Sequence, residues 1–187
     1  MRMTGLSTRF PRFHGFSMIE VLVGLVLTCI GVLGMVALQA RSIHYTQSAV
    51  NHNQAILLAD NLLEMMRSNP SGALTDDLFT TSSTYYKAPG SAFASTSTSL
   101  DECLSRDRSN GGSTVATADL DCWRQEVQSL LPVTDDALEA SFAICPSASP
   151  DSCSASGSSV VMIQIAWTDN SGECDDNLCI YRLRSEL

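Results

Sequence analysis

The sequence predicts an α+β fold in which a long N-terminal helix, membrane-spanning in its first half, packs on an antiparallel β-sheet with disulfide-closed loops. Three patterns support this prediction. Residues 21–40 form an uncharged apolar run, helical periodicity continues to Asn69, and short alternating segments follow position 140. The chain of 187 residues has room for one modest folded domain besides such a helix.

The apolar run is long enough to cross a membrane as a helix. Its 20 residues, 21–40, would span ~30 Å at ~1.5 Å per residue, which matches the hydrocarbon core of a bilayer. A secretory signal peptide usually has only ~7–15 apolar residues before a small-residue cleavage site, and the residues after Ala40 offer no such site. Because Arg2, Arg9 and Arg12 precede the run, we expect a cytoplasmic N terminus and a periplasmic C-terminal part.

Glu20 stands at the start of this run, and a plain signal anchor does not explain it. A carboxylate inside the bilayer costs roughly 2.5–3.5 kcal/mol, so it needs a partner. Cleavage after Gly15 would create a protonated amino terminus on Phe16, about one helical turn from Glu20. The segment 15–20 therefore predicts a processing site followed by a charge that acts in assembly.

The helix is expected to continue beyond the membrane. No proline or glycine occurs from Gln39 to Asn69, and apolar or small residues recur every three to four positions from Ala49 to Met66. The next residue, Pro70, disfavours helix at Asn69. We therefore expect one helix from Phe16 to about Ser68, with its second half packed on a soluble domain.

The remaining chain predicts loops, one further helix and a small sheet. Residues 71–116 are rich in Ser, Thr, Gly and Asp and are expected to be mainly loop, partly closed by Cys103. A second helix is expected at 118–131, where an apolar stripe follows a first turn crowded with acidic residues. Alternating residues predict strands at 140–144 and 161–167, and a third short run predicts one at 178–184, which suggests an antiparallel sheet.

The seven cysteines divide by position. Cys29 lies in the apolar run, where a thiol behaves as a small hydrophobe. The other six, without a CxxC pair or accompanying histidine, favour disulfides over zinc and imply an oxidising compartment. Several pairings are possible, and the sequential ones are favoured: Cys103–Cys122, Cys145–Cys153 and Cys174–Cys179.

No catalytic motif is present, so the sequence predicts neither an enzyme nor a cofactor. Beyond the first three arginines the chain holds eight basic and 20 acidic residues, a composition that disfavours nucleic acid as a partner. His44 and His52 are expected on the surface of the long helix.

Two further clusters have competing interpretations. The acids Asp169, Glu173, Asp175 and Asp176 lack the spacing of a calcium-binding EF-hand, so a solvated loop is favoured over a metal site. The segment 85–87, Tyr-Tyr-Lys, is explained equally well by contact with a partner and by turn or core packing.

The N-terminal segment resembles the type IV prepilin family. Members of this family carry a basic leader that ends in Gly, then usually Phe, then Glu as the fifth mature residue and a long apolar stretch; Gly15, Phe16 and Glu20 match these positions. The resemblance implies a leader peptide, 1–15, with cleavage before Phe16 and methylation of its amine by a prepilin peptidase. It also implies the pilin architecture, with 16–40 as the transmembrane and filament-core half of the helix and 41–187 as a soluble domain that includes the amphipathic half.

The first ~70 residues, together with a Cys-Trp pair before Leu-Pro, resemble the PilV kind of minor pilin, also called type IV pilus modification protein. The chain departs from major pilins because its membrane helix lacks proline and its C-terminal part has six cysteines. Such minor pilins act in a tip complex that primes pilus assembly and supports twitching motility and attachment.

This resemblance implies as partners the other minor pilins, the major pilin, the prepilin peptidase and a tip adhesin. It places the chain first in the inner membrane and then in the pilus fibre at the cell surface. Two alternatives stay open on sequence grounds: a minor pseudopilin of a type II secretion system, and a membrane-tethered periplasmic enzyme or binding domain.

Overall fold

A computed structural model describes residues 15, 17–93 and 98–187. The chain falls into two compact units, one ending at Ile43 and one comprising His44–Leu187. Phe16, at the expected cleavage site, lies outside the described residues.

The predicted long helix is present as α1, Met18–Arg67. It ends where Asn69 and Pro70 were expected to stop it. Its first part, in the N-terminal unit, exposes its large apolar side chains; Leu22 and Leu33, for example, are 63% and 70% exposed. Its second part contributes a buried stripe to the other unit. The stripe consists of Asn51, Ala55, Leu58, Ala59, Leu62, Leu63 and Met66.

A three-stranded antiparallel sheet follows, in the order β3-β4-β5. The strands are β3 (Ala143–Pro146), β4 (Val160–Thr168) and β5 (Leu178–Glu186), and Ile144, Ile163 and Leu183 lie side by side in the register. The antiparallel sheet was predicted, but its first strand begins at Ala143 instead of at 140. The reason is a short helix, α5 (Asp135–Ala140), whose N-terminus is capped by the Thr134 side chain.

The second predicted helix is present but begins earlier. It is α4, Gly112–Leu130, and it starts at two glycines with positive φ, the N-cap Gly111 (φ 59°) and the first helical residue Gly112 (φ 76°). The acidic residues expected in its first turn, Asp119 and Asp121, therefore lie in its interior and are buried. That part of the prediction was wrong, because the glycines were counted as loop.

The region expected to be mainly loop contains more structure than predicted. It holds α2 (Pro70–Ala73), a short hairpin of β1 (Leu74–Thr75) and β2 (Leu78–Phe79), and α3 (Leu100–Ser105). The N-terminus of α3 is stabilised by a capping box, in which Ser99 and Glu102 bond to each other's backbone N–H. A 3₁₀ turn, η1 (Asp175–Asn177), precedes β5.

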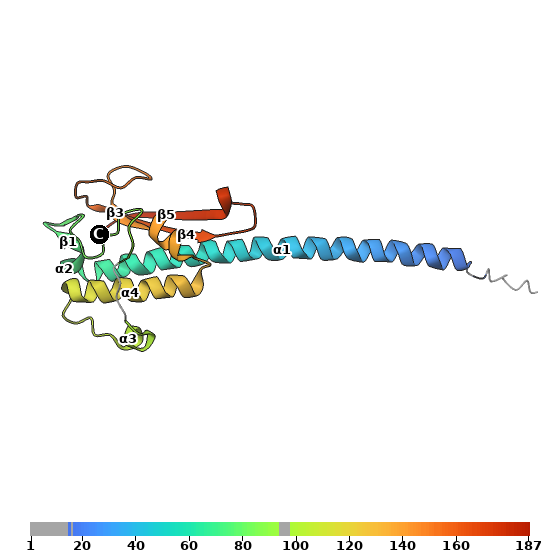
Figure 1. The fold of residues 1–187 in the computed structure, drawn as a ribbon, viewed down its shortest axis with the longest axis horizontal. Coiled ribbons are helices and arrows are strands. Elements are labelled where there is room, and N and C mark those ends of the chain that lie inside the picture. Colours follow the sequence, from blue (N-terminus) through green and yellow to red (C-terminus); the bar gives the residue numbers. More distant parts are fainter. Residues whose placement is uncertain (1–14, 16, 94–97) are drawn as a thin grey trace, which may run out of the picture. The chain divides into compact units, whose positions relative to one another are not determined.

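The second part of α1 lies between α4 and the sheet (Figure 1). On the α4 side, the indole of Trp123 donates a hydrogen bond of 2.8 Å to the Leu58 carbonyl oxygen. On the sheet side, Ile163, Ile165 and Trp167 of β4 belong to the same buried cluster as Leu58. All members of this cluster lie at or after Ala55, so the second unit has a core of its own.

Candidate functional site

The N-terminal candidate site begins at Gly15 and includes the first turn of α1. Gly15 and Glu20 are both exposed, and the Glu20 amide donates to the Ser17 carbonyl oxygen at 3.0 Å. Within the described part of the chain, no cationic side chain forms an ion pair with the Glu20 carboxylate. The carboxylate is therefore available to a cation from outside the described residues.

The helix that follows Glu20 is long and apolar enough to cross a membrane. Its most apolar 18-residue window has a mean hydropathy of 2.7, and none of that window is buried. The hydroxyl of its polar Thr28 has hydrogen-bond partners within the helix, because it donates to the Gly24 and Leu25 carbonyl oxygens at 2.8 and 2.9 Å. Cys29, also exposed here, is a free thiol.

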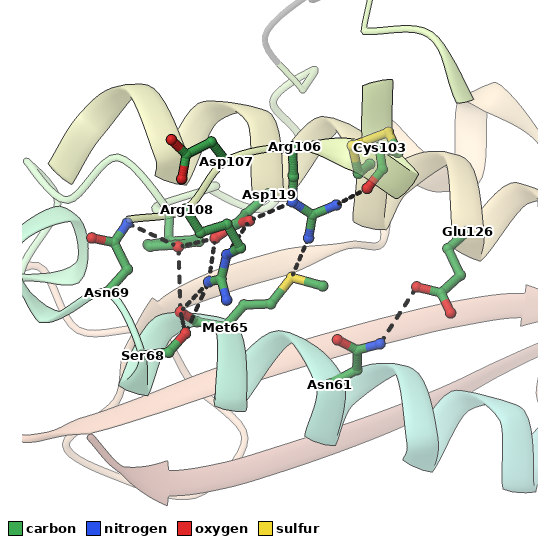
Figure 2. A network of polar contacts seen from close by, with 12 residues as sticks. Asn61, Met65, Ser68, Asn69, Cys103, Arg106, Asp107, Arg108, Asp119 and Glu126 are labelled. Atoms are coloured by element: carbon green, nitrogen blue, oxygen red, sulfur yellow. Dashed lines mark hydrogen bonds and ion pairs between the residues drawn. A yellow bond between two sulfur atoms is a disulfide. The ribbon is translucent and has the colours of Figure 1, made fainter. Parts of the chain in front are cut away.

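In the second unit, the carboxylate of Asp119 is fully buried and belongs to a network of polar contacts (Figure 2). Its Oδ1 accepts from Nε of Arg106 and Nε of Arg108, both at 3.0 Å. Its Oδ2 accepts from Arg108 Nη2 at 2.8 Å and from the Tyr85 hydroxyl at 2.6 Å. Two arginines and a phenol thus compensate for the cost of burying this charge.

The same arginines connect the loop after α3 to the last turn of α1. Arg108 Nη2 donates to the Met65 carbonyl oxygen at 3.1 Å and to the Ser68 hydroxyl at 2.9 Å. Arg106 Nη1 donates to the Cys103 carbonyl oxygen at 3.1 Å. Figure 2 shows the two guanidinium groups between Asp119 and Met65. The network therefore fixes the loop after α3 against both helices.

Burial and hydrogen bonding shift two pKa values in this network. Burial raises the pKa of Tyr85 well above its usual range, and the hydrogen bond to Asp119 raises it further. The hydrogen bond to Asp119 also raises the pKa of Arg108. Both side chains hold their protons at neutral pH, so the network is a stable structural clamp and not a proton-transfer device.

Asn69 closes the adjacent turn. Its Nδ2 donates to the Gly112 carbonyl oxygen at 3.0 Å, and its Oδ1 accepts from the Gly112 amide at 2.7 Å. A Cβ on Gly72 would lie 2.6 Å from Asn69 Nδ2 and 2.7 Å from the Gly112 oxygen. Glycine at position 72 is therefore what lets α2 approach the start of α4 so closely.

Three disulfides are present: Cys103–Cys122, Cys145–Cys153 and Cys174–Cys179. These are the sequential pairs that the sequence analysis favoured. The first joins α3 to α4 next to Asp119, the second closes the loop after β3, and the third closes the turn before β5.

The other residues singled out from the sequence take structural positions. Tyr85 and Lys87 are buried, so core packing explains them better than contact with a partner. The ring of the exposed His52 is in T-shaped contact with Trp167 and Tyr181, at centroid distances of 6.0 and 5.7 Å. The described residues contain no group of three or more His, Cys, Asp or Glu side chains that could hold a metal ion, and this includes the acids from Asp169 to Asp176.

Sequence reasoning missed the Asp119 network. Its members are scattered between positions 65 and 119, and most of them fall in the stretch expected to be loop. One signal was available: Asp119 lies three or four residues from Val115, Ala116, Cys122 and Trp123, all of which are buried. An acidic residue on an otherwise buried helical stripe indicates a partnered internal charge.

These features define a membrane-anchored, structural protein of the pilin type: an exposed apolar helix led by a carboxylate, continued into an α+β domain with disulfides. Comparisons with known families agree. A model described as "Prokaryotic N-terminal methylation motif" matches residues 11–36, and one described as "Type IV pilin Tt1218" matches residues 37–123. The chain is therefore a non-enzymatic type IV pilin-like protein with the N-terminal methylation motif, which implies processing by a prepilin peptidase. Searches among curated proteins and among solved structures gave no match.

Proposed function

We propose that this protein is a minor pilin of the PilV kind, a structural subunit of the complex that primes pilus assembly at the tip. The observation that carries the proposal is the exposed, uncharged apolar helix with Glu20 in its first turn. A bare apolar surface of this length needs lipid or other apolar helices as its surroundings. An isolated carboxylate at its start needs a cation there.

The processed amino terminus supplies that cation in this proposal. Cleavage after Gly15 leaves an amine on Phe16, which pairs with Glu20 in its own chain or in a packed neighbour. The pair is buried when the helix moves from the membrane into the filament. We infer the division of the chain accordingly: leader 1–15, membrane and filament segment 16–40, and soluble domain 41–187.

Two features favour a minor subunit over the bulk filament subunit. The membrane helix has no proline, and the soluble domain has three disulfides, one of which anchors α3 to α4. The proposed partners are other minor pilins, the major pilin and a tip adhesin. The proposed roles are to promote assembly, twitching motility and attachment.

Substitution of Glu20 tests the proposal. Glu20→Ala should still insert in the membrane, because the span becomes more apolar, and its soluble domain should still fold. Its incorporation into sheared pili, normalised to the membrane pool, should fall strongly, because an ion-pair partner left alone in a buried site costs about 3–5 kcal/mol. Glu20→Asp, with the charge kept and the reach shortened, should be intermediate.

The controls distinguish a defect in processing from a defect in assembly, and a pilus subunit from a subunit of a secretion system. Intact-mass analysis of native material should show a chain that begins at a methylated Phe16, in the wild type and in Glu20→Ala alike. Normal incorporation of Glu20→Ala, or a chain that begins at Met1, would refute the proposal. Loss of type II secretion with normal piliation in a deletion strain would identify a minor pseudopilin instead.

A further inference from the structure

The two edges of the three-stranded sheet differ in how they are covered. At the β3 edge, Lys87 forms a bridge to Ile144, with two backbone hydrogen bonds of 2.9 Å. At the β5 edge, no other described segment pairs with the strand. β5 forms nine consecutive pairs with β4, from Leu178 to Glu186, so it is long and has no bulge. An open edge of this kind is a template for a further strand.

The register shows which backbone groups of β5 point away from β4. The ladder is flanked by bonds from Asp169 N to Asn177 O at 2.9 Å and from Leu187 N to Ser159 O at 3.3 Å. In an antiparallel pair such bonded positions alternate, so the odd-numbered residues of β5 bond to β4. The N–H and C=O groups of Ile180, Arg182 and Arg184 therefore point outward, and no described residue bonds to them.

Side chains along this edge are apolar on one face and basic on the other. Tyr181 and Leu183 are partly buried against the core. On the opposite face, Ile180 is 43% exposed and is followed by the exposed Arg182 and Arg184. A strand added here would continue the apolar face beside Tyr181 and Leu183, and would place every second side chain next to the arginines.

Two carboxylates lie near the two arginines, namely Asp151 and Glu186, the latter two positions beyond Arg184 on the same face of β5. Arg184 donates to the Ser147 hydroxyl at 3.1 Å and to the Ser147 carbonyl oxygen at 3.2 Å, both neutral acceptors. Arg182 donates to Gln164 at 2.6 Å, and its pair with the exposed Asp151 is 3.4 Å long. In a chain of net charge −9, this edge is a local basic surface that carboxylates complement.

A second copy of the chain fits this edge poorly. Antiparallel pairing of two β5 strands over their full length would place Arg182 opposite Arg182 and Ile180 opposite Arg184. Like charges directly opposite each other destabilise a strand pair. The overall acidity of the chain adds repulsion between copies.

We propose that the outer edge of β5 is a β-augmentation site that takes an extended, carboxylate-bearing segment of a different protein. The outward groups of Ile180, Arg182 and Arg184 bond to the backbone of that segment. Arg182 and Arg184 select acidic side chains at alternate positions. The inference does not depend on the proposed role in pili, because it uses only contacts inside the second unit.

A short designed peptide tests the site on the full mature chain in non-ionic detergent. The probe is the fluorescent peptide Thr-Val-Glu-Val-Glu-Val-Thr, and the readout is anisotropy. Two control peptides should each bind at least about tenfold more weakly. One has lysine in place of the two glutamates. The other is methylated on the two Glu amide nitrogens, so it has the same charge but cannot form the backbone hydrogen bonds of a strand pair. Equal binding of the methylated form would show ion pairing without strand addition and would overturn the proposal.

Four variants complete the test. Ile180→Pro removes one outward N–H and keeps both arginines, so it should lose binding, whereas Ile180→Val should keep it. The double variant Arg182→Gln, Arg184→Gln should also lose binding. Gln128→Glu with Ser129→Glu, on α4 at the other side of α1 (Figure 1), changes the net charge equally and should bind normally.

Two further results would overturn the assignment. One is absence of binding by the acidic peptide to the wild-type chain. The other is a homodimer in sedimentation equilibrium that Ile180→Pro dissociates, since the occupant would then be a second copy. If Ile180→Pro fails to fold, the methylated peptide still tests the proposal, because it is measured on the wild-type chain.

Discussion

At the scale of single residues, the soluble unit depends on a few buried polar groups whose partners come from distant positions. Asp119, on α4, is bonded by two arginines from the loop after α3 and by Tyr85 from a third segment. None of these side chains is placed by local sequence preference. The network therefore forms only when the surrounding fold is complete.

Replacing Asp119 by Asn should destabilise the soluble unit strongly. The variant keeps the shape but removes the charge that Arg106 and Arg108 share. Breaking a buried ion pair typically costs about 3–5 kcal/mol, and we expect the low end because both arginines are partly exposed. Glu126→Gln, at the half-buried partner of Asn61, is the matched control and should change little. Urea unfolding measures both; similar stabilities for the two variants would contradict the central role of Asp119.

Lys87 should give the stability of the soluble unit an alkaline pH dependence. Its ammonium group is buried, donates to the Phe142 and Glu139 carbonyl oxygens at 2.8 and 3.1 Å, and lies 5.0 Å from the centre of the Phe93 ring. Burial lowers its pKa from 10.5 to about 8, although nearby Glu139 acts in the opposite direction. The folded state therefore releases this proton at a lower pH than the unfolded chain does.

The sign of the effect follows from this difference. Below pH 8 both states bind the proton, so the contribution is constant. Above it the unfolded chain binds more protons, and the free energy of unfolding should rise by roughly 1–2 kcal/mol up to pH 9.5. Above pH 10 the raised pKa of Tyr85 acts against this rise. Denaturant unfolding of wild type and Lys87→Met over pH 7–9.5 checks the prediction; a parallel rise in both would refute it.

At the scale of elements, periodic patterns were the reliable part of the sequence. The apolar repeat of α1 and the alternation in β4 each predicted the right element near the right place, because burial on one face imposes the period. Short elements were missed. α3 and α5 have only six residues each and are held by capping and by tertiary contacts, neither of which produces a period.

The Cys103–Cys122 disulfide should stabilise α3 more than the other two disulfides stabilise their loops. It closes the longest loop, with a separation of 19 residues against 8 and 5. In the chain-entropy description this corresponds to about 3 kcal/mol, against about 2 kcal/mol for the shortest. We expect Cys103→Ser with Cys122→Ser to lose more stability than Cys174→Ser with Cys179→Ser. Hydrogen exchange should increase first in α3; unchanged protection there would contradict the prediction.

At the scale of the whole molecule, the buried cluster predicts where the chain can be divided. Its members lie at or after Ala55, so a fragment 44–187 retains all of them. We expect this fragment to be soluble, monomeric and folded, as judged by size-exclusion chromatography and cooperative thermal unfolding. The fragment 60–187 is the control: it lacks Ala55, Leu58 and Ala59 and should not fold, since loss of one buried leucine alone costs about 2–5 kcal/mol. Aggregation of the longer fragment would show that the soluble unit needs the apolar segment.

The candidate site of the N-terminal unit was predictable from the sequence, whereas the sites of the second unit were not. Gly15, Phe16 and Glu20 are adjacent in sequence, so the motif can be read without a fold. The Asp119 network and the edge of β5 depend on which segments lie side by side. Arg182 and Arg184, for example, are ordinary polar residues of an alternating strand until the register shows that their backbone groups face outward.

The order of the disulfides has a consequence for how the chain matures. The six cysteines of the soluble unit are joined in consecutive pairs, first to second, third to fourth and fifth to sixth, and no third cysteine lies inside any of the loops. A chain that enters an oxidising compartment from its N-terminal end exposes these residues one after another. Oxidation in order of appearance then produces the native pairs directly. We therefore expect maturation of this domain to need a thiol oxidant but no isomerase that rearranges wrong pairs.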